Sequence, residues 1–190
     1  MYTAFTPHRV SLADFRSDSP TQDPADQAVI INFGPWRNYR FKFDRVESSF
    51  YNFSDDELPE FPALLKSGEG WLRSAIPDLS FQTHLFTYSC HNKLSEGDST
   101  DFLLGLSTMN IPGIGIDRGN GIIFHWDVPE QAWRVRLTAD HSTSVAGGMF
   151  VHFALTSTTD KLDYAQTLHH AKTFLERVLE HIGLSLEREN

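Results

Sequence analysis

Residues 133–140 alternate strictly between apolar and polar side chains, and no other feature of the chain constrains its fold as strongly. Side chains on a β-strand point to opposite faces in turn, so this segment predicts a half-buried strand. Its inward set is Trp133, Val135, Leu137 and Ala139. Residues 122–128 show the same alternation, and the short link Pro129-Glu130-Gln131 between the two segments predicts an antiparallel hairpin.

A third strand and a long helix follow this hairpin. Residues 149–156 carry apolar side chains at every second position, which predicts another half-buried strand. Apolar residues then recur at steps of three and four across residues 164–182, so one amphipathic helix is predicted there. We expect Thr159 or Asp160 to cap its start and Gly183 to end it. A stripe of this length must be buried, and the preceding sheet is the nearest surface.

The remaining elements do not alternate regularly between strand and helix. Strands are predicted at 28–33, 39–44 and 81–90, a helix up to Pro77, and a short helix at 99–106. This order argues against a parallel doubly wound sheet. The predicted fold is α+β, with a mostly antiparallel sheet packed on the long C-terminal helix in a helix-grip-like arrangement, and with a second, shorter helical segment.

Length and composition favour one folded domain that follows an N-terminal arm. The chain has 190 residues, of which 40% are hydrophobic, and this is enough to form a core. Residues 17–26 are polar, acidic and rich in proline, which predicts a flexible arm over residues 1–27 and a single α+β domain over residues 28–190. The first part of this arm would dock on the domain or on a neighbouring subunit through its apolar residues Phe5, Val10, Leu12 and Phe15.

Charge and cysteine content restrict the partners and the compartment. The net charge of −9 repels a phosphate backbone, so we expect no nucleic-acid partner. Cys90 is the only cysteine, which excludes an intramolecular disulfide and favours the cytoplasm. The chain contains no apolar stretch long enough for a bilayer and begins without a signal-peptide pattern, so we expect no membrane association. Nucleotide and metal motifs are absent, and we expect no cofactor.

Two histidines and one aspartate form a candidate metal site. His125 and Asp127 share the polar face of one predicted strand, and His152 lies on the polar face of another. Two imidazoles and a carboxylate could hold a divalent ion with an open position, as in a metal-dependent hydrolase. Because their spacing matches no known ligand motif, an ordinary solvated sheet face is the alternative.

Aromatic residues on both faces of the predicted sheet suggest a binding surface. Phe86, Tyr88 and Phe150 are the candidate ligand-binding residues. One face can pack on the long helix, whereas the other needs a second helix, another subunit or a ligand to cover it. The first hypothesis is therefore an interaction module that forms a homodimer or binds a protein partner. The second is a carrier of a small apolar ligand, with a cavity between sheet and helix.

The tripeptide Asp140-His141-Ser142 contains the residue types of a hydrolase triad. Triad members converge from separate segments, and the chain has no Gly-x-Ser-x-Gly elbow, so we interpret the tripeptide as part of a polar loop. The sequence as a whole favours a non-enzymatic protein.

The C-terminal half resembles a sporadically distributed family of uncharacterised bacterial proteins. The resemblance lies in the segment Gly121–Asp127, the strand Met149–Thr156 and the helix that carries Leu168, Phe174 and Leu175. It implies a bacterial protein with a phage- or defence-related role, and it transfers no functional residue. The expected sheet and long helix are also similar to those of lipid- and hormone-binding helix-grip proteins, a likeness of fold that does not fix function.

Overall fold

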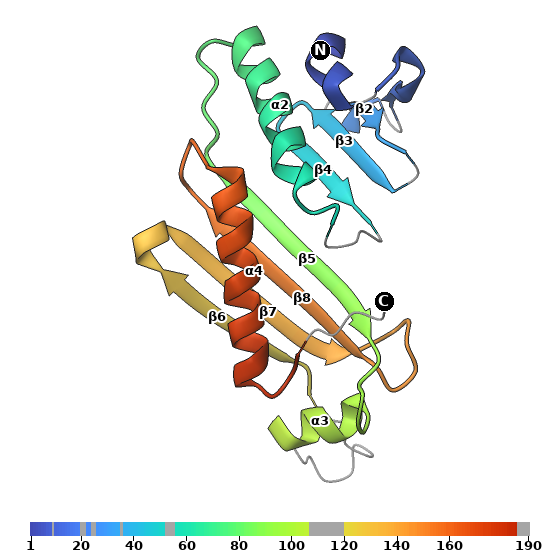
Figure 1. Ribbon diagram of the computed structural model, residues 1–190, viewed down its shortest axis with the longest axis vertical. Coiled ribbons are helices and arrows are strands. Elements are labelled where there is room, and N and C mark those ends of the chain that lie inside the picture. The colour runs from blue at the N-terminus through green and yellow to red at the C-terminus, as the bar shows by residue number, and fades with distance from the viewer. Residues whose placement is uncertain are drawn as a thin grey trace. The chain divides into compact units, whose positions relative to one another are not determined.

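Figure 1 shows the computed structural model, which describes residues 1–8, 10–19, 22–23, 26–34, 36–51, 56–106 and 120–185. The chain divides into two compact units. Unit 1 comprises Met1–Leu79 and Asp163–His170, and unit 2 comprises Ser80–Leu162 and Ala171–Asn190. The predicted α+β class is confirmed, because helices accompany two four-stranded antiparallel sheets. The single domain over residues 28–190 stays a prediction.

Unit 1 is built on an antiparallel sheet with the strand order β1-β2-β3-β4 (Figure 1). Its strands are β1 (Phe15–Asp18), β2 (Ala28–Asn32), β3 (Arg37–Lys42) and β4 (Val46–Phe50). Its helical elements are α1 (Tyr2–Phe5), the 3₁₀ turns η1 (Thr6–His8) and η2 (Leu12–Asp14), and α2 (Glu60–Ala75). The predicted strands at 28–33 and 39–44 correspond to β2 and β3.

The core of unit 1 includes residues from the predicted N-terminal arm. Phe5 and Val10 are buried there with Ile31, Tyr39 and Leu64. Strand β1 also comes from the arm and pairs with β2 along its whole length. Phe5, Val10 and Phe15 of the arm therefore dock on this core, whereas Leu12 is 69% exposed. Four positions of the polar segment 17–26, namely 20–21 and 24–25, lie outside the described residues.

Buried polar contacts join β3, α2 and the first turn of the C-terminal helix within unit 1. Burial, with the nearby charge of Glu69, raises the pKa of Tyr39 well above its usual range. Burial and a hydrogen bond to Glu69 do the same to the pKa of Tyr164. Glu69 also accepts from Arg73 Nε at 2.7 Å. Because two tyrosines and one arginine meet a single carboxylate, these side chains have fixed positions.

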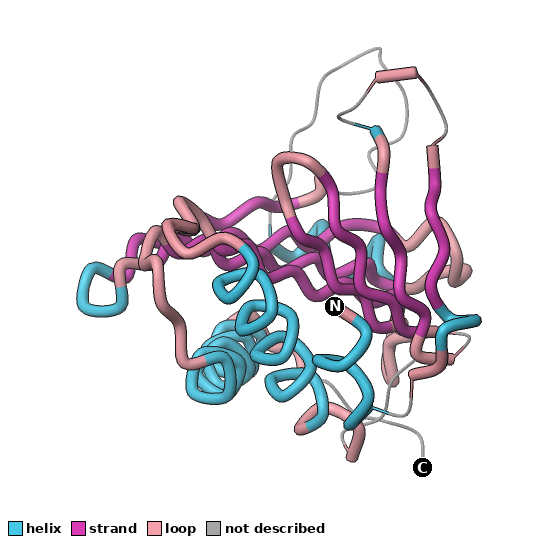
Figure 2. The backbone as a smooth tube through the Cα atoms, turned by 90° about the horizontal axis from the view of Figure 1, so that it is seen from above, coloured by secondary structure: helices cyan, strands magenta, loops and turns pink. Residues whose placement is uncertain are grey.

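Unit 2 is a second antiparallel sheet, with the strand order β5-β8-β7-β6, and the long helix α4 lies on one of its faces (Figures 1 and 2). Its elements are β5 (His84–Asn92), α3 (Ser99–Leu106), β6 (Ile122–Val128), the turn η4 (Pro129–Gln131), β7 (Trp133–His141), β8 (Met149–Ser157) and the larger part of α4 (Tyr164–His181). The predicted β6–β7 hairpin is confirmed, with Trp126 opposite Val135.

The face of this sheet that packs on α4 is called the inner face, and the opposite one the outer face. Val135, Leu137, Phe153 and Leu155 of the inner face form one core with buried side chains of α4. The α4 side chains are Ala171, Leu175 and Leu179. The predicted burial of the helix stripe on the sheet is therefore confirmed, while the comparison with helix-grip proteins stays a prediction.

The predicted cap of the C-terminal helix was wrong, and its predicted end was correct. The helix begins at Tyr164, and the Asp163 carboxylate accepts from the backbone N–H of Gln166 at 3.0 Å. Asp160 instead accepts from the backbone N–H of Phe81 at 2.7 Å, so it is already used by another segment. Gly183 has a φ of +84°, which suits the left-handed residue at a helix end.

Replacing Gly68 by alanine should destabilise the protein, whereas Gly70→Ala should not. A Cβ at Gly68 would lie 2.2 Å from the Tyr39 hydroxyl, but a Cβ at Gly70 would have no neighbour within 4 Å. Overpacking costs roughly 1–3 kcal/mol, and an open helical glycine gains up to about 1 kcal/mol as alanine. Urea unfolding of both variants measures the difference, and equal stabilities would contradict the close Tyr39–Gly68 contact.

Candidate functional site

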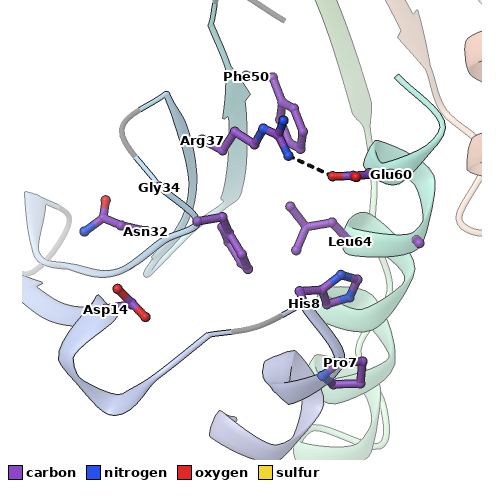
Figure 3. A pocket seen from close by; sticks show the side chains of 11 residues that line it. Pro7, His8, Asp14, Asn32, Gly34, Arg37, Phe50, Glu60 and Leu64 are labelled. Carbon is purple, nitrogen blue, oxygen red and sulfur yellow. Dashed lines mark hydrogen bonds and ion pairs between the residues drawn. The ribbon is translucent and has the colours of Figure 1, made fainter. Parts of the chain in front are cut away.

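A pocket of about 600 Å³ lies within unit 1, between α2, the N-terminal segment and one end of the sheet (Figure 3). Its lining consists of Pro7, His8, Asp14, Asn32, Phe33, Gly34, Arg37, Phe50, Glu60, Ala63 and Leu64. This volume is in the range of small-molecule sites. Segments far apart in the sequence contribute to it, so it exists only in the folded unit.

Arg37 is held on three sides. Its Nη1 donates to Glu60 at 2.7 Å, and its Nη2 donates to Glu57. Its guanidinium lies 5.5 Å from the centre of the Phe50 ring, which belongs to the directly paired residue on β4. A cation that two carboxylates and an aromatic face engage is fixed in orientation and is largely neutralised.

The opposite side of the pocket is also organised by local hydrogen bonds. His8 Nε2 lies 2.9 Å from Ser67 Oγ, and the His8 ring packs edge-on against Phe33. Asp14 accepts from the backbone N–H and the hydroxyl of Ser11, at 2.7 and 2.8 Å. These two bonds lower the pKa of Asp14, so its carboxylate is ionised at neutral pH. The pocket therefore combines fixed polar groups with aromatic walls.

The predicted ligand-binding residues do not converge on one site. Phe86 and Tyr88 lie on the inner face of the unit 2 sheet, opposite Leu155 and Phe153, and pack against its core. Phe150 lies on the outer face, with its ring centre 4.8 Å from that of His91. Alternation along a strand explains this result, because Phe150 and Phe153 must point to opposite faces.

The candidate metal ligands lie on the outer face but are separated by strand β7. His125 is opposite Arg136, whereas His152 is opposite Thr138 on the other side of β7. Asp127 is 3.8 Å from Arg134, and His152 Nδ1 is 2.7 Å from Ser89 Oγ. Among the residues that the structure describes, no group of three or more His, Cys, Asp or Glu side chains is placed to hold a metal ion.

The Asp140-His141-Ser142 tripeptide does not form a triad. His141 Nδ1 lies 2.8 Å from the buried Ser99 hydroxyl, and Ser142 Oγ lies 2.9 Å from His91. Ser142 also accepts from the backbone N–H of Val145, which fixes a turn. The prediction of a polar loop was wrong for Asp140 and His141, which are the last two residues of β7, and only Ser142 lies in the turn that follows the strand.

Cys90 is partly buried and packs against the core of unit 2. Burial raises the pKa of its thiol, and Asn92 Nδ2 donates to its sulfur at 3.0 Å. A raised pKa leaves little of the reactive thiolate at neutral pH, so this side chain acts in packing.

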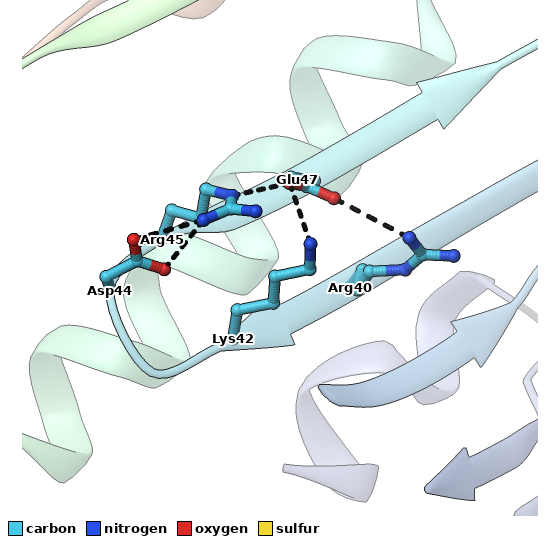
Figure 4. Close-up of polar contacts among 5 residues, drawn as sticks. All are labelled: Arg40, Lys42, Asp44, Arg45 and Glu47. Atoms are coloured by element: carbon cyan, nitrogen blue, oxygen red, sulfur yellow. Dashed lines mark hydrogen bonds and ion pairs between the residues drawn. The ribbon is translucent and has the colours of Figure 1, made fainter. Parts of the chain in front are cut away.

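Carboxylates pair with three basic residues at the β3–β4 hairpin, namely Arg40, Lys42 and Arg45 (Figure 4). Glu47 lies 2.6 Å from Arg45 Nε, 3.4 Å from Lys42 and 3.8 Å from Arg40. Burial opposes ionisation of Glu47, but its bonds to Arg45 and Lys42 prevail and lower its pKa. Asp44 adds a second carboxylate beside Arg45, so the positive charge of this cluster is largely compensated.

Comparison with known proteins found no relative of this chain. No family model matches the chain, and neither a curated protein nor a solved structure matches it. No helix in the described ranges has the length and apolar character needed to cross a membrane. The pocket of unit 1 could not be predicted from sequence, because its lining residues belong to no motif.

We expect His152 to titrate below the ordinary histidine value of 6.5. Burial, followed by the charge of Arg136, lowers the pKa of His152. As the pH falls, His152 is therefore protonated at a higher pH in the unfolded chain than in the folded chain. Its protonation favours unfolding, so His152 lowers the stability of the fold below about pH 6.5. NMR titration of the imidazole measures the midpoint, and Arg136→Gln should raise it. A midpoint unchanged by that substitution would contradict the assigned charge effect.

Proposed function

We propose that this protein is a non-enzymatic binding protein that takes a small molecule into the pocket of unit 1. The observation that carries this proposal is a cavity of about 600 Å³ whose polar lining is already fixed before any ligand enters. Preorganised groups lose little conformational freedom on binding, which favours affinity.

Three features of the lining support recognition. The Arg37 guanidinium is oriented by Glu57, Glu60 and the ring of Phe50. Asp14 is oriented by Ser11 on another segment. Phe33 and Leu64 contribute apolar walls, and a few convergent polar groups beside such walls are typical of small-molecule sites.

The position of the site differs from the one that the sequence suggested. A cavity between sheet and C-terminal helix was expected, but the inner face of unit 2 is occupied by the buried side chains of Leu137, Leu155 and Leu175. Buried side chains of the sheet and of α4 thus meet where that cavity was expected. The ligand-binding proposal therefore rests on unit 1.

Filling the pocket should abolish binding while the fold is retained. Ala63 lines the pocket from the first turn of α2 and is exposed, so Ala63→Phe adds bulk without disturbing a core. Amide spectra of the wild type, titrated with benzylamine, benzyl alcohol and benzoate, should shift at pocket residues with at least one probe. These shifts should be lost in Ala63→Phe.

Ala165→Phe is the matched control, because Ala165 is an equally exposed alanine in the first turn of α4 and does not line the pocket. It should bind the probes as the wild type does. If all three probes leave the wild-type spectrum unchanged, or if Ala63→Phe binds them equally well, the proposed function is wrong.

A second candidate function is self-association through the outer face of the unit 2 sheet. Leu85 is 64% exposed and Ile123 is 56% exposed on this face. Arg134 and Arg136 share it with Asp127, so the face carries both signs of charge. A two-fold interface joins a surface to its own copy, and a patch of mixed charge can match itself.

Sedimentation velocity over a concentration series tests this homodimer. Leu85→Lys and Ile123→Lys should each shift the protein toward the monomer, because a lysine at a self-contact is buried against its own copy. Ile76→Lys changes a residue of unit 1 that is 50% exposed and should have no effect. A wild-type protein that stays monomeric at the highest concentration would exclude this candidate.

Two further parts of the proposal concern cellular context. The unpaired Cys90 thiol supports a cytoplasmic location. The resemblance of the C-terminal half supports a bacterial protein with a phage- or defence-related role. These two statements, and the absence of catalysis, stay predictions.

A further inference from the structure

The charges around the unit 1 pocket restrict which small molecules fit it. Among the described residues, Asp14 and Glu60 place carboxylates in the lining, and Glu57 adds a third beside Arg37. Arg37 is the one guanidinium among the lining residues described, and both glutamates already engage it. The described part of the lining therefore has a negative net charge.

We propose that the ligand of this pocket is cationic, an amine or guanidine joined to an aromatic or apolar body. The inference rests on the proposed binding function and specifies the charge of its ligand. Asp14 and Asn32 offer acceptor oxygens on one side of the pocket, and Phe33 and Phe50 offer aromatic surface, as Figure 3 shows for the labelled residues. Cations bind to carboxylates and to the faces of aromatic rings.

An anionic ligand is disfavoured by the same geometry. It would have to compete with Glu57 and Glu60 for Arg37, and Glu60 lies only 2.7 Å from that guanidinium. The displaced carboxylates would then face the anion across a small pocket, where like charges repel. The pairing of Arg37 thus converts a basic residue into part of a site that favours cations.

Three probes of similar shape and different charge test the inference on the full chain. They are 2-phenylethylamine, 2-phenylethanol and 3-phenylpropanoate, and isothermal titration at neutral pH and low salt gives their dissociation constants. We expect the amine to bind about tenfold more tightly than the carboxylate, a ratio that corresponds to about 1.4 kcal/mol. Added salt should reduce this ratio, because it screens partly exposed charges.

Two variants of the lining move the preference in opposite directions. Asp14→Asn removes a carboxylate and should lower the ratio of amine to carboxylate affinity. Asn32→Asp adds a carboxylate at a lining position and should raise the ratio. Glu180→Gln removes one negative charge from an exposed position of α4 and should leave the ratio unchanged, which controls for net charge.

The outcomes separate the two levels of the proposal. The cationic ligand is supported if the wild type prefers the amine and if this preference falls in Asp14→Asn and rises in Asn32→Asp. Equal binding of all three probes, or tighter binding of the carboxylate, overturns this inference and leaves the binding function intact. If no probe binds and the Ala63→Phe spectra confirm that the pocket is not used, the proposed function fails and the inference fails with it.

Discussion

Burial of alternating side chains on one face of a sheet is the constraint on which both units depend. In unit 2, Val135, Leu137 and Leu155 are almost fully inaccessible to solvent because α4 covers them. Each such side chain contributes about 1.5–3 kcal/mol when it is buried. Side chains on a strand alternate between its faces, so the same arrangement directs His125 of β6 and the two arginines of β7 to the outer face.

Unit 1 follows the same rule with a different cover. Ile31 and Tyr39 are opposite each other on β2 and β3 and pack with Phe5 and Leu64. The Tyr39 hydroxyl comes so close to α2 that only glycine fits at position 68. This close approach, with the contacts of Glu69, positions the first turns of α2, and those turns supply one wall of the pocket.

Besides the buried contacts of Glu69, polar groups pair in two other settings. At the β3–β4 hairpin they pair locally, as Glu47 does with Arg45, and such exposed ion pairs contribute little to stability. At the pocket they are also paired, but there the pairs border an open volume. Arg37 and Asp14 therefore keep fixed directions toward a space that a ligand can enter, and this distinguishes the pocket from the surface pair of Glu47 and Arg45.

Periodicity alone determined the elements of the C-terminal half, because strand and helix periods differ and the apolar sets of residues 133–140 and 164–182 are uninterrupted. Local chemistry correctly predicted that the helix ends at Gly183. It could not decide whether Asp160 or Asp163 caps the start of the helix, because aspartate is suitable at either position. Only the fold shows that Asp160 accepts from the backbone N–H of Phe81 instead. The candidate site depended on tertiary structure entirely. His8, Asp14, Arg37 and Glu60 lie on different elements, and no spacing along the chain predicts their meeting, because the pairing of β1 to β4 and the packing of α2 decide it.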